Sequence, residues 1–246
     1  MSLPDATETP VRVVSLEWSL FLRWMESNWP PGTHIALIGP TGEGKTTFAV
    51  GIMALRKWIL ALDAKGEDGT LSASGFRRVT KLPLSGRIRN DIAEGKPARL
   101  ILGGATDSND AERRLRALLA RGVAMVRHQG GWTLYADEFQ ILADLRMFGL
   151  GKSIEQGLIS ARDKGTSIVT SFQAPAWVPK ASTRQATIVV MWPTRDISMI
   201  KSVAESMGRD WRELLEIVRH LPRFHVVVIP KSIFEPYIIT HAPKVG

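Results

Sequence analysis

The stretch Gly39-Pro40-Thr41-Gly42-Glu43-Gly44-Lys45-Thr46 matches in full the pattern of a phosphate-binding loop. Its glycines let the backbone turn tightly and approach a phosphate without a clash at Cβ. Successive N–H groups and the start of a following helix then form a cradle for anions. Residues 34–38, before the loop, are a short apolar run typical of a buried parallel strand. The loop, with Thr47, therefore predicts a site for the phosphates of ATP.

The last loop residues predict individual contacts. Lys45 is expected to reach the β- and γ-phosphates, and the Thr46 hydroxyl is expected to bind Mg²⁺. A second motif lies at 133–138, where an apolar strand ends in Asp137 and Glu138. An Asp at such a strand end supports the Mg²⁺ ion, and an adjacent Glu can orient and polarise a water.

The acid pair has a second interpretation. Gln140 lies three residues after Asp137, as in a capping box at the start of a helix. Both interpretations can hold together. A water-polarising Glu138 favours hydrolysis over phosphoryl transfer to a small molecule.

Strands alternate with helices along the chain, which predicts an α/β fold with a mostly parallel central sheet flanked by helices. We expect a P-loop ATPase core at 33–246, preceded at 1–32 by an N-terminal tail, a short strand and a helix. Strands are expected at 11–14, 34–38, 76–80, 98–102, 132–136, 166–172, 187–192, 224–229 and, as an edge, 237–240. Helices are expected at 16–27, 45–62, 108–121, 154–164, 196–207 and 210–220, with a loop at 61–75.

Composition excludes several classes. The 246 residues are 44% apolar and contain no cysteine, so disulfide frameworks and thiolate chemistry are excluded. No apolar run reaches the ~18 residues of a membrane helix, and the first ten residues do not resemble a signal peptide. We expect a cytoplasmic protein with no membrane segment of its own.

Basic residues give a net charge of +8, which favours a polyanionic partner. Residues 76–99 have seven basic side chains against two acidic ones, and a second basic group follows. The two groups are Arg77, Arg78, Lys81, Arg87, Arg89, Lys96 and Arg99, and then Arg113, Arg114, Arg116, Arg121 and Arg127. The pattern predicts contact with a nucleic-acid backbone independent of base sequence, although each residue alone also fits an ordinary solvated surface.

Over residues 32–229 the chain resembles the FtsK–HerA superfamily of P-loop ATPases, in the division with an additional strand and a catalytic glutamate. The phosphate loop and the acid pair carry this resemblance. So do Ile159-Ser-Ala-Arg162-Asp-Lys-Gly165 before the strand ending at Gln173, and the run 174–196. Ala174 departs from the cell-division branch, which usually has Arg at this position.

The resemblance implies a RecA-like core and an ATP-driven ring, a pentamer or hexamer, that moves double-stranded DNA. The compact chain looks most like viral genome-packaging ATPases, with a capsid portal or vertex as a possible docking partner and a place in the host cytoplasm or on a procapsid or virion. It implies that Arg162 acts on the nucleotide of a neighbouring subunit, with Arg146 and Arg195 as alternatives. Gln173 would sense the γ-phosphate.

Three alternatives stay open on the sequence. One is a related motor for conjugation, secretion or phage export. Another is a nucleotide-switched DNA-binding protein with little turnover, which the presence of Glu138 disfavours. The third is a small-molecule phosphotransferase.

Overall fold

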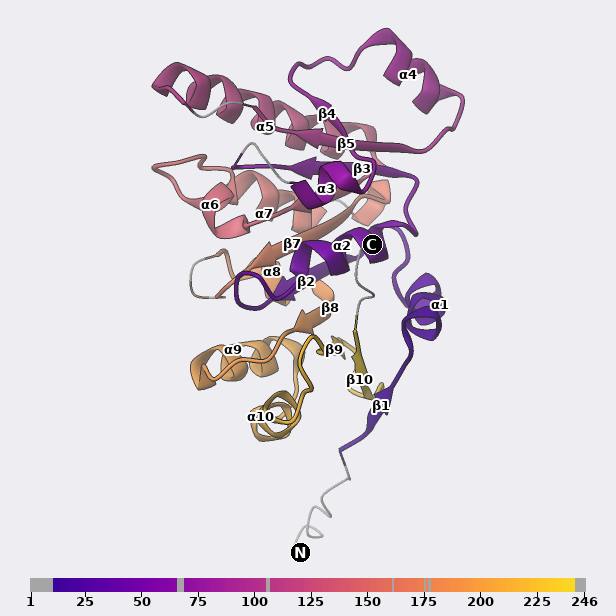
Figure 1. Cartoon of the computed structure of the whole chain (residues 1–246), viewed down its shortest axis with the longest axis vertical. Coiled ribbons are helices and arrows are strands. Elements are labelled where there is room, and N and C mark those ends of the chain that lie inside the picture. The colour runs from indigo at the N-terminus through magenta and orange to yellow at the C-terminus, as the bar shows by residue number, and fades with distance from the viewer. Residues whose placement is uncertain are drawn as a thin grey trace, which may run out of the picture.

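The computed structural model describes residues 11–65, 69–104, 107–160, 162–174, 176 and 178–241. The expected tail at 1–10, and Pro175 and Trp177 of the run 174–196, lie outside this part. Within it, one ten-stranded sheet runs through the molecule (Figure 1) in the order β1-β10-β9-β8-β2-β7-β6-β3-β5-β4. The strands are β1 (Val13–Ser15), β2 (His34–Ile38), β3 (Trp58–Leu62), β4 (Arg77–Val79), β5 (Ala98–Leu102), β6 (Thr133–Ala136), β7 (Ser167–Phe172), β8 (Ala186–Met191), β9 (Val226–Pro230) and β10 (Tyr237–Thr240).

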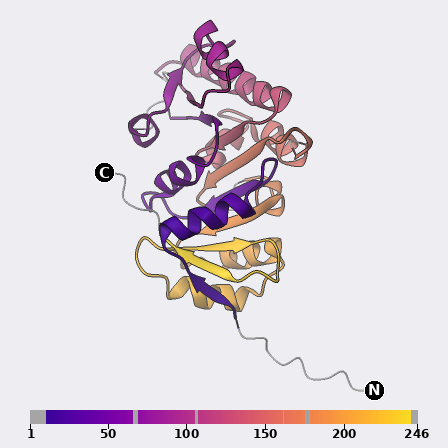
Figure 2. The ribbon, with the colours of Figure 1, turned by 90° about the vertical axis from the view of Figure 1, so that its right-hand side faces the viewer.

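Helices cover both faces of the sheet (Figure 2). One face carries α1 (Trp18–Asn28), α2 (Lys45–Met53) and α3 (Gly69–Ala73), and the other carries the remaining helices. These are α4 (Gly86–Ala93), α5 (Asn109–Gln129), α6 (Phe139–Ala143), α7 (Gly151–Ser160), α8 (Ala181–Arg184), α9 (Ile197–Met207) and α10 (Trp211–Arg219), with the 3₁₀ turn η1 (Arg162–Lys164). Side chains of β2 alternate between two apolar clusters: Ile35 and Leu37 join one, and Ala36 and Ile38 the other. This burial on both faces explains why the strand is apolar throughout.

Strand order confirms the predicted α/β P-loop fold. The central strands run β8-β2-β7-β6-β3 and are all parallel, while β9 is antiparallel to β8. Strand β7 lies between β2, which precedes the phosphate loop, and β6, which precedes the acid pair. This is the additional strand. The carboxyl ends of these strands form one edge of the sheet, here called the carboxyl edge, and their starts form the amino edge.

The expected helix at 45–62 is wrong. Helix α2 ends at Met53, and residues 58–62 form β3, buried between β5 and β6. Both segments are apolar, and a short apolar run does not distinguish a strand from a buried helix by periodicity. The nonlocal pairing with β5 and β6 decides the outcome.

The loop expected at 61–75 is also wrong, because β3 continues to Leu62 and Gly69–Ala73 form α3. Two further segments differ from expectation. Residues 237–240 form an interior strand rather than an edge, because β1 pairs with their open side. Helix α4 was not expected; it begins after Ser85, whose hydroxyl accepts a hydrogen bond from Ile88 N at 3.5 Å. Strands 34–38 and 98–102 have the predicted bounds, and the other predicted strands and helices are present with shifted ends, most clearly α5, which extends to Gln129.

Candidate functional site

The phosphate loop crosses the carboxyl edge between β2 and α2. Gly42 and Gly44 have φ values of +82° and +88°, in the left-handed region that glycine adopts without strain. A Cβ at either would meet nothing within 4 Å, so conformation rather than crowding requires glycine. At Gly39 crowding decides, since a Cβ would come within 2.6 Å of the Trp192 Cβ. The loop is therefore shaped by the protein and open on the side that a ligand would approach.

Lys45 lies at the start of α2 and reaches back over its own loop. Its ammonium donates hydrogen bonds to the carbonyl oxygens of Gly39 at 2.8 Å and Pro40 at 2.6 Å. Burial lowers the pKa of Lys45, and the nearby carboxylates, Asp137 foremost, oppose that shift. A bound phosphate would give this cation a charged partner in place of two carbonyls.

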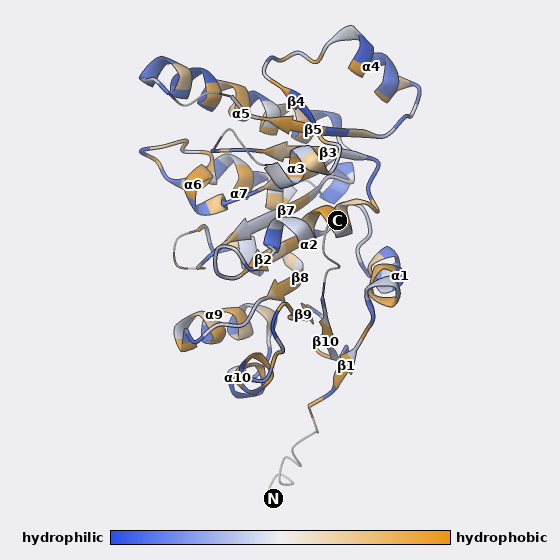
Figure 3. Cartoon of the chain, viewed as in Figure 1, coloured by the Kyte–Doolittle hydropathy of each residue, from blue (hydrophilic) through white to orange (hydrophobic). Residues whose placement is uncertain are grey.

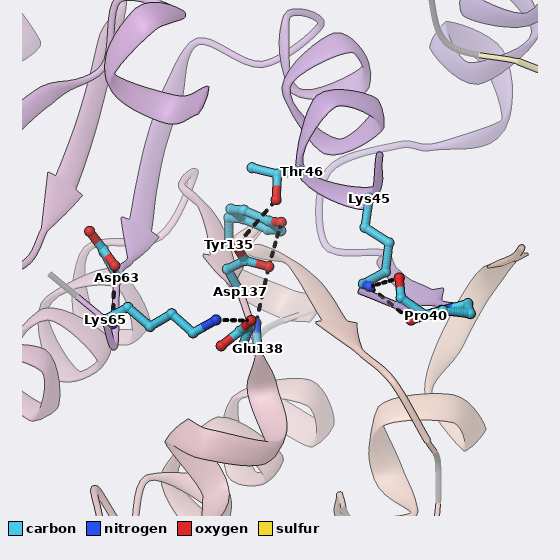
Figure 4. Close-up of polar contacts among 9 residues, drawn as sticks. Pro40, Lys45, Thr46, Asp63, Lys65, Tyr135, Asp137 and Glu138 are labelled. Carbon is cyan, nitrogen blue, oxygen red and sulfur yellow. Dashed lines mark hydrogen bonds and ion pairs between the residues drawn. The ribbon is translucent and has the colours of Figure 1, made fainter. Parts of the chain in front are cut away.

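Asp137 is held by three neighbours. Its Oδ1 accepts hydrogen bonds from the Tyr135 hydroxyl at 2.9 Å and from Glu138 N at 3.0 Å. Its Oδ2 accepts one from the Thr46 hydroxyl at 3.3 Å, which joins the two motifs (Figure 4). Burial, and secondarily the charge of Asp137, raises the pKa of Tyr135 well above its usual value, so the phenol stays a donor. Tyr135 was not identified from the sequence, because it lies in an otherwise apolar strand.

The Thr46 and Asp137 oxygens fit Mg²⁺. The ion prefers hard oxygen ligands and is usually held by one or two protein groups beside substrate phosphates. Asp137 Oδ2 faces Thr46 while Oδ1 is fixed by its two donors, the kind of outer support that orients a metal ligand. These residues would hold the ion, which supplies charge neutralisation at the phosphates.

Glu138 directly precedes α6, as its N-cap residue, and has a left-handed backbone with φ 45° and ψ 53°. Its Oε1 lies 2.5 Å from the Lys65 ammonium. Its Oε2 is buried and makes no hydrogen bond within the described residues. Lys65 was also missed by the sequence, because it follows β3, which was expected to be part of a helix.

A cavity of about 270 Å³ brings most of the predicted residues together. Its lining includes Thr41, Gly42, Gly44, Lys45, Thr46, Thr47, Asp137, Glu138, Gln140 and Gln173. A neighbouring cavity of about 280 Å³ is bounded by Thr46 and both acids and extends to Asp63 and Lys65. Gln173, which follows β7, therefore shares one space with the phosphate loop and the acids.

The three candidate arginines lie in different places. Arg162 is exposed in η1 at the amino edge, where its carbonyl oxygen packs against Gly32. Arg195 follows β8 and lines a cavity of about 650 Å³ with Pro40 of the phosphate loop. Arg146 is exposed in the turn after α6. Within one chain, Arg162 and the phosphate loop are thus at opposite edges of the sheet.

Solved structures share this architecture. The genome-packaging NTPase B204 from Sulfolobus turreted icosahedral virus 2, in complex with AMPPCP, is 17% identical, with a TM-score of 0.60 over 88% of this chain and 100% of that chain. The complex with ATP-γS is 16% identical, with a TM-score of 0.58 over 87% and 99%. The chain has the fold of these packaging ATPases.

The predicted resemblance to FtsK–HerA ATPases is thereby confirmed at the level of the fold. VirB4 of Thermoanaerobacter pseudethanolicus has the same TM-score, 0.60, at 8% identity, over 86% of this chain and 89% of that chain. No protein-family model and no curated protein sequence matches the chain. Among the residues that the structure describes, no helix is long and apolar enough to cross a bilayer.

Proposed function

We propose that the chain is an ATP-hydrolysing motor of the FtsK–HerA type that moves double-stranded DNA and packages a viral genome. One observation carries the proposal: a single cavity is lined by the phosphate loop, the acid pair and Gln173. The likeness to the packaging NTPase B204, at 17% identity against 8% for VirB4 with the same TM-score, supports the packaging role over the related export motors. We place the motor in the host cytoplasm or on a procapsid or virion.

In the proposed reaction, Glu138 accepts a proton from water as the water oxygen bonds to the terminal phosphorus. The bond from that phosphorus to the bridging oxygen breaks, giving ADP and inorganic phosphate. Lys45 and the loop N–H groups stabilise the negative charge on the phosphates, and Thr46 and Asp137 hold Mg²⁺ beside them. Gln173 contacts the γ-phosphate or the attacking water and responds to its loss.

We propose that an arginine from a neighbouring subunit completes the site in a pentameric or hexameric ring. Arg162 is our first candidate, because its exposed position at the amino edge leaves it free to reach another subunit but not its own cavity. Arg146 and Arg195 are the alternatives. Arg162→Ala subunits mixed into wild-type rings should lower turnover more than in proportion to their share while still binding ATP. Full turnover by rings made only of that variant would remove Arg162 from this role.

The DNA contact is proposed for the segment 76–99, which includes β4 and α4. Hydrophilic residues are frequent on α4, whereas β5 beside it is largely hydrophobic (Figure 3). Arg77, Lys81, Arg87 and Arg89 are exposed there, whereas Lys96 pairs with Asp91 and Glu94. Such exposed cations neutralise backbone phosphates, so affinity for duplex DNA should fall steeply with salt. A capsid portal or vertex is the proposed docking partner.

The proposal is tested by ATP hydrolysis measured against protein concentration, with and without duplex DNA. We expect turnover per subunit to rise with both. Assembly supplies the arginine of the neighbouring subunit, and DNA is the polymer on which the proposed motor acts. Turnover independent of both would contradict a ring motor. Absence of phosphate release with intact ATP binding would instead favour a nucleotide-switched binding protein.

A further inference from the structure

The ion pair between Lys65 and Glu138 ties up the side chain that the proposed reaction needs as a base. Lys65 Nζ lies 2.5 Å from Glu138 Oε1, and the other oxygen, Oε2, is buried. One carboxylate oxygen is therefore engaged by the ammonium, and the other is out of contact with solvent. In Figure 4 the Lys65 side chain extends across to Glu138 from the side opposite Lys45.

The backbone of Lys65 is anchored by a buried acid. Lys65 N donates to Asp63 Oδ1 at 3.1 Å, and the Arg78 guanidinium donates twice to Asp63 Oδ2, at 3.1 and 3.2 Å. Asp63 is only 4% exposed. Gly103 at the end of β5 leaves room for this contact, because a Cβ there would come within 2.3 Å of Arg78 Nη1. The main chain at Lys65 is thus held by Asp63. Through Asp63, Arg78 connects Lys65 to the basic segment 76–99.

The Lys65 side chain itself is able to move. It is 63% exposed, and Lys65 lines the cavity that also contains Thr46 and Asp137. A terminal phosphate bound beside Thr46 would compete with Glu138 for the ammonium, since cations bind phosphate by charge-assisted hydrogen bonds.

We propose that Lys65 is a positioning residue that holds Glu138 in a resting ion pair, which opens when ATP binds and so frees Glu138 for water. The inference rests on the proposed ATPase function. An ion pair with one exposed partner contributes little energy, so the pair sets a modest brake on turnover without DNA rather than blocking it.

The first test compares Lys65→Met with Lys57→Met. Lys57 is also exposed and precedes the same strand, β3, at the amino edge. At ATP concentrations well below saturation, where the resting pair is populated, DNA-independent ATP hydrolysis should rise roughly two- to fivefold in Lys65→Met, the factor expected for an exposed pair. It should not change in Lys57→Met. Unchanged or lower turnover in Lys65→Met would overturn the proposal, the latter by making Lys65 a phosphate-binding group.

The second test needs no hydrolysis. The affinity for a non-hydrolysable ATP analogue is measured for wild type, Lys65→Met, Glu138→Gln and the double variant. If binding opens the pair, Lys65→Met should improve affinity by roughly two- to fivefold more in the wild-type background than in the Glu138→Gln background, where the pair is already lost. Equal effects in both backgrounds would overturn the inference. If wild type hydrolysed no ATP, the proposed function would fail while this cycle still reported on the pair.

Discussion

The two edges of the central sheet differ in how their polar side chains are hydrogen-bonded. At the amino edge, His34 Nδ1 accepts a hydrogen bond from Ile168 N at 3.0 Å, and Ser167 Oγ accepts one from Gly32 N at 3.2 Å. Arg56 donates to Trp29 O at 2.6 Å and lies 3.8 Å over the Trp29 ring. Apart from the buried Arg56 Nε, which makes no hydrogen bond within the described residues, these groups are satisfied by the protein itself, as the packing of a stable core requires.

At the carboxyl edge, the polar groups and the backbone surround the cavity of the candidate site. Gly42, Gly44 and Glu138 have positive φ values, and Lys45 binds main-chain carbonyls of its own loop. Glu138 Oε2 is buried without a hydrogen bond within the described residues. A non-glycine residue with positive φ and a buried carboxylate oxygen without a hydrogen bond are both features that a bound ligand can support. The difference indicates that the amino edge serves folding and the carboxyl edge serves the nucleotide.

Glu138→Gln should give the largest effect. It removes the proposed base but keeps the size of the side chain, so the rate of the chemical step should fall by about 10²–10⁴. ATP affinity should stay within a few-fold of wild type, as measured by equilibrium binding beside single-turnover hydrolysis. The control is Glu155→Gln in α7, outside the cavity. Undiminished hydrolysis by Glu138→Gln would end its role as base.

Lys45→Met should come next. Removing the cation deprives the phosphates of a charge-assisted partner, so ATP affinity should fall by about 10²-fold. Folding stability should change little, because the ammonium binds only carbonyls of its own loop. Titration with a fluorescent ATP analogue beside urea unfolding separates the two effects. An equal loss of affinity in Lys57→Met at the amino edge would show that charge alone, and not the site, is responsible.

Protonation of His34 at the amino edge should lower the folding stability in acid. Burial lowers the pKa of His34 from 6.5 to about 4, although a backbone hydrogen bond opposes the shift. The unfolded chain therefore binds a proton below pH 6.5 that the folded chain refuses until about pH 4. The stability from neutral His34 is complete above pH 6.5 and is lost as pH falls toward 4, by about 3 kcal/mol in all.

Urea unfolding of wild type and His34→Asn between pH 4 and pH 6.5 measures the contribution of His34 to the free energy of unfolding. The amide oxygen of Asn keeps an acceptor for Ile168 N but does not titrate. The free energy of unfolding of the variant should fall less steeply below pH 6.5 than that of wild type. Parallel pH profiles would refute the assignment to His34.

Gly44→Ala should give the smallest effect on stability. An L-residue in the left-handed region costs about 1–2 kcal/mol, and no contact is lost because a Cβ there meets nothing. Gly86→Ala is the matched control, since Gly86 is equally open but has no positive φ. Urea unfolding should show a loss only at Gly44. Equal changes at both positions would argue against conformational strain in the loop.

Local motifs explain how much of the site was predictable. The phosphate loop, the acid pair and Gln173 each follow an apolar strand, so their spacing alone predicts that they meet at one edge of a parallel sheet. Lys65 and Asp63 were missed because they depend on β3, whose strand identity comes from pairing with β5 and β6 rather than from its own pattern. The action of Arg162 on a neighbouring subunit stays a prediction, because it depends on assembly.

A structure of the full chain bound to Mg²⁺ and a non-hydrolysable ATP analogue tests the central claim most directly. We predict that the triphosphate lies on the N–H groups of residues 42–47 and that Lys45 has left the carbonyls of Gly39 and Pro40. The terminal phosphate should face Glu138 with one water between them. Phosphates bound elsewhere, or a terminal phosphate facing away from Glu138, would contradict the account.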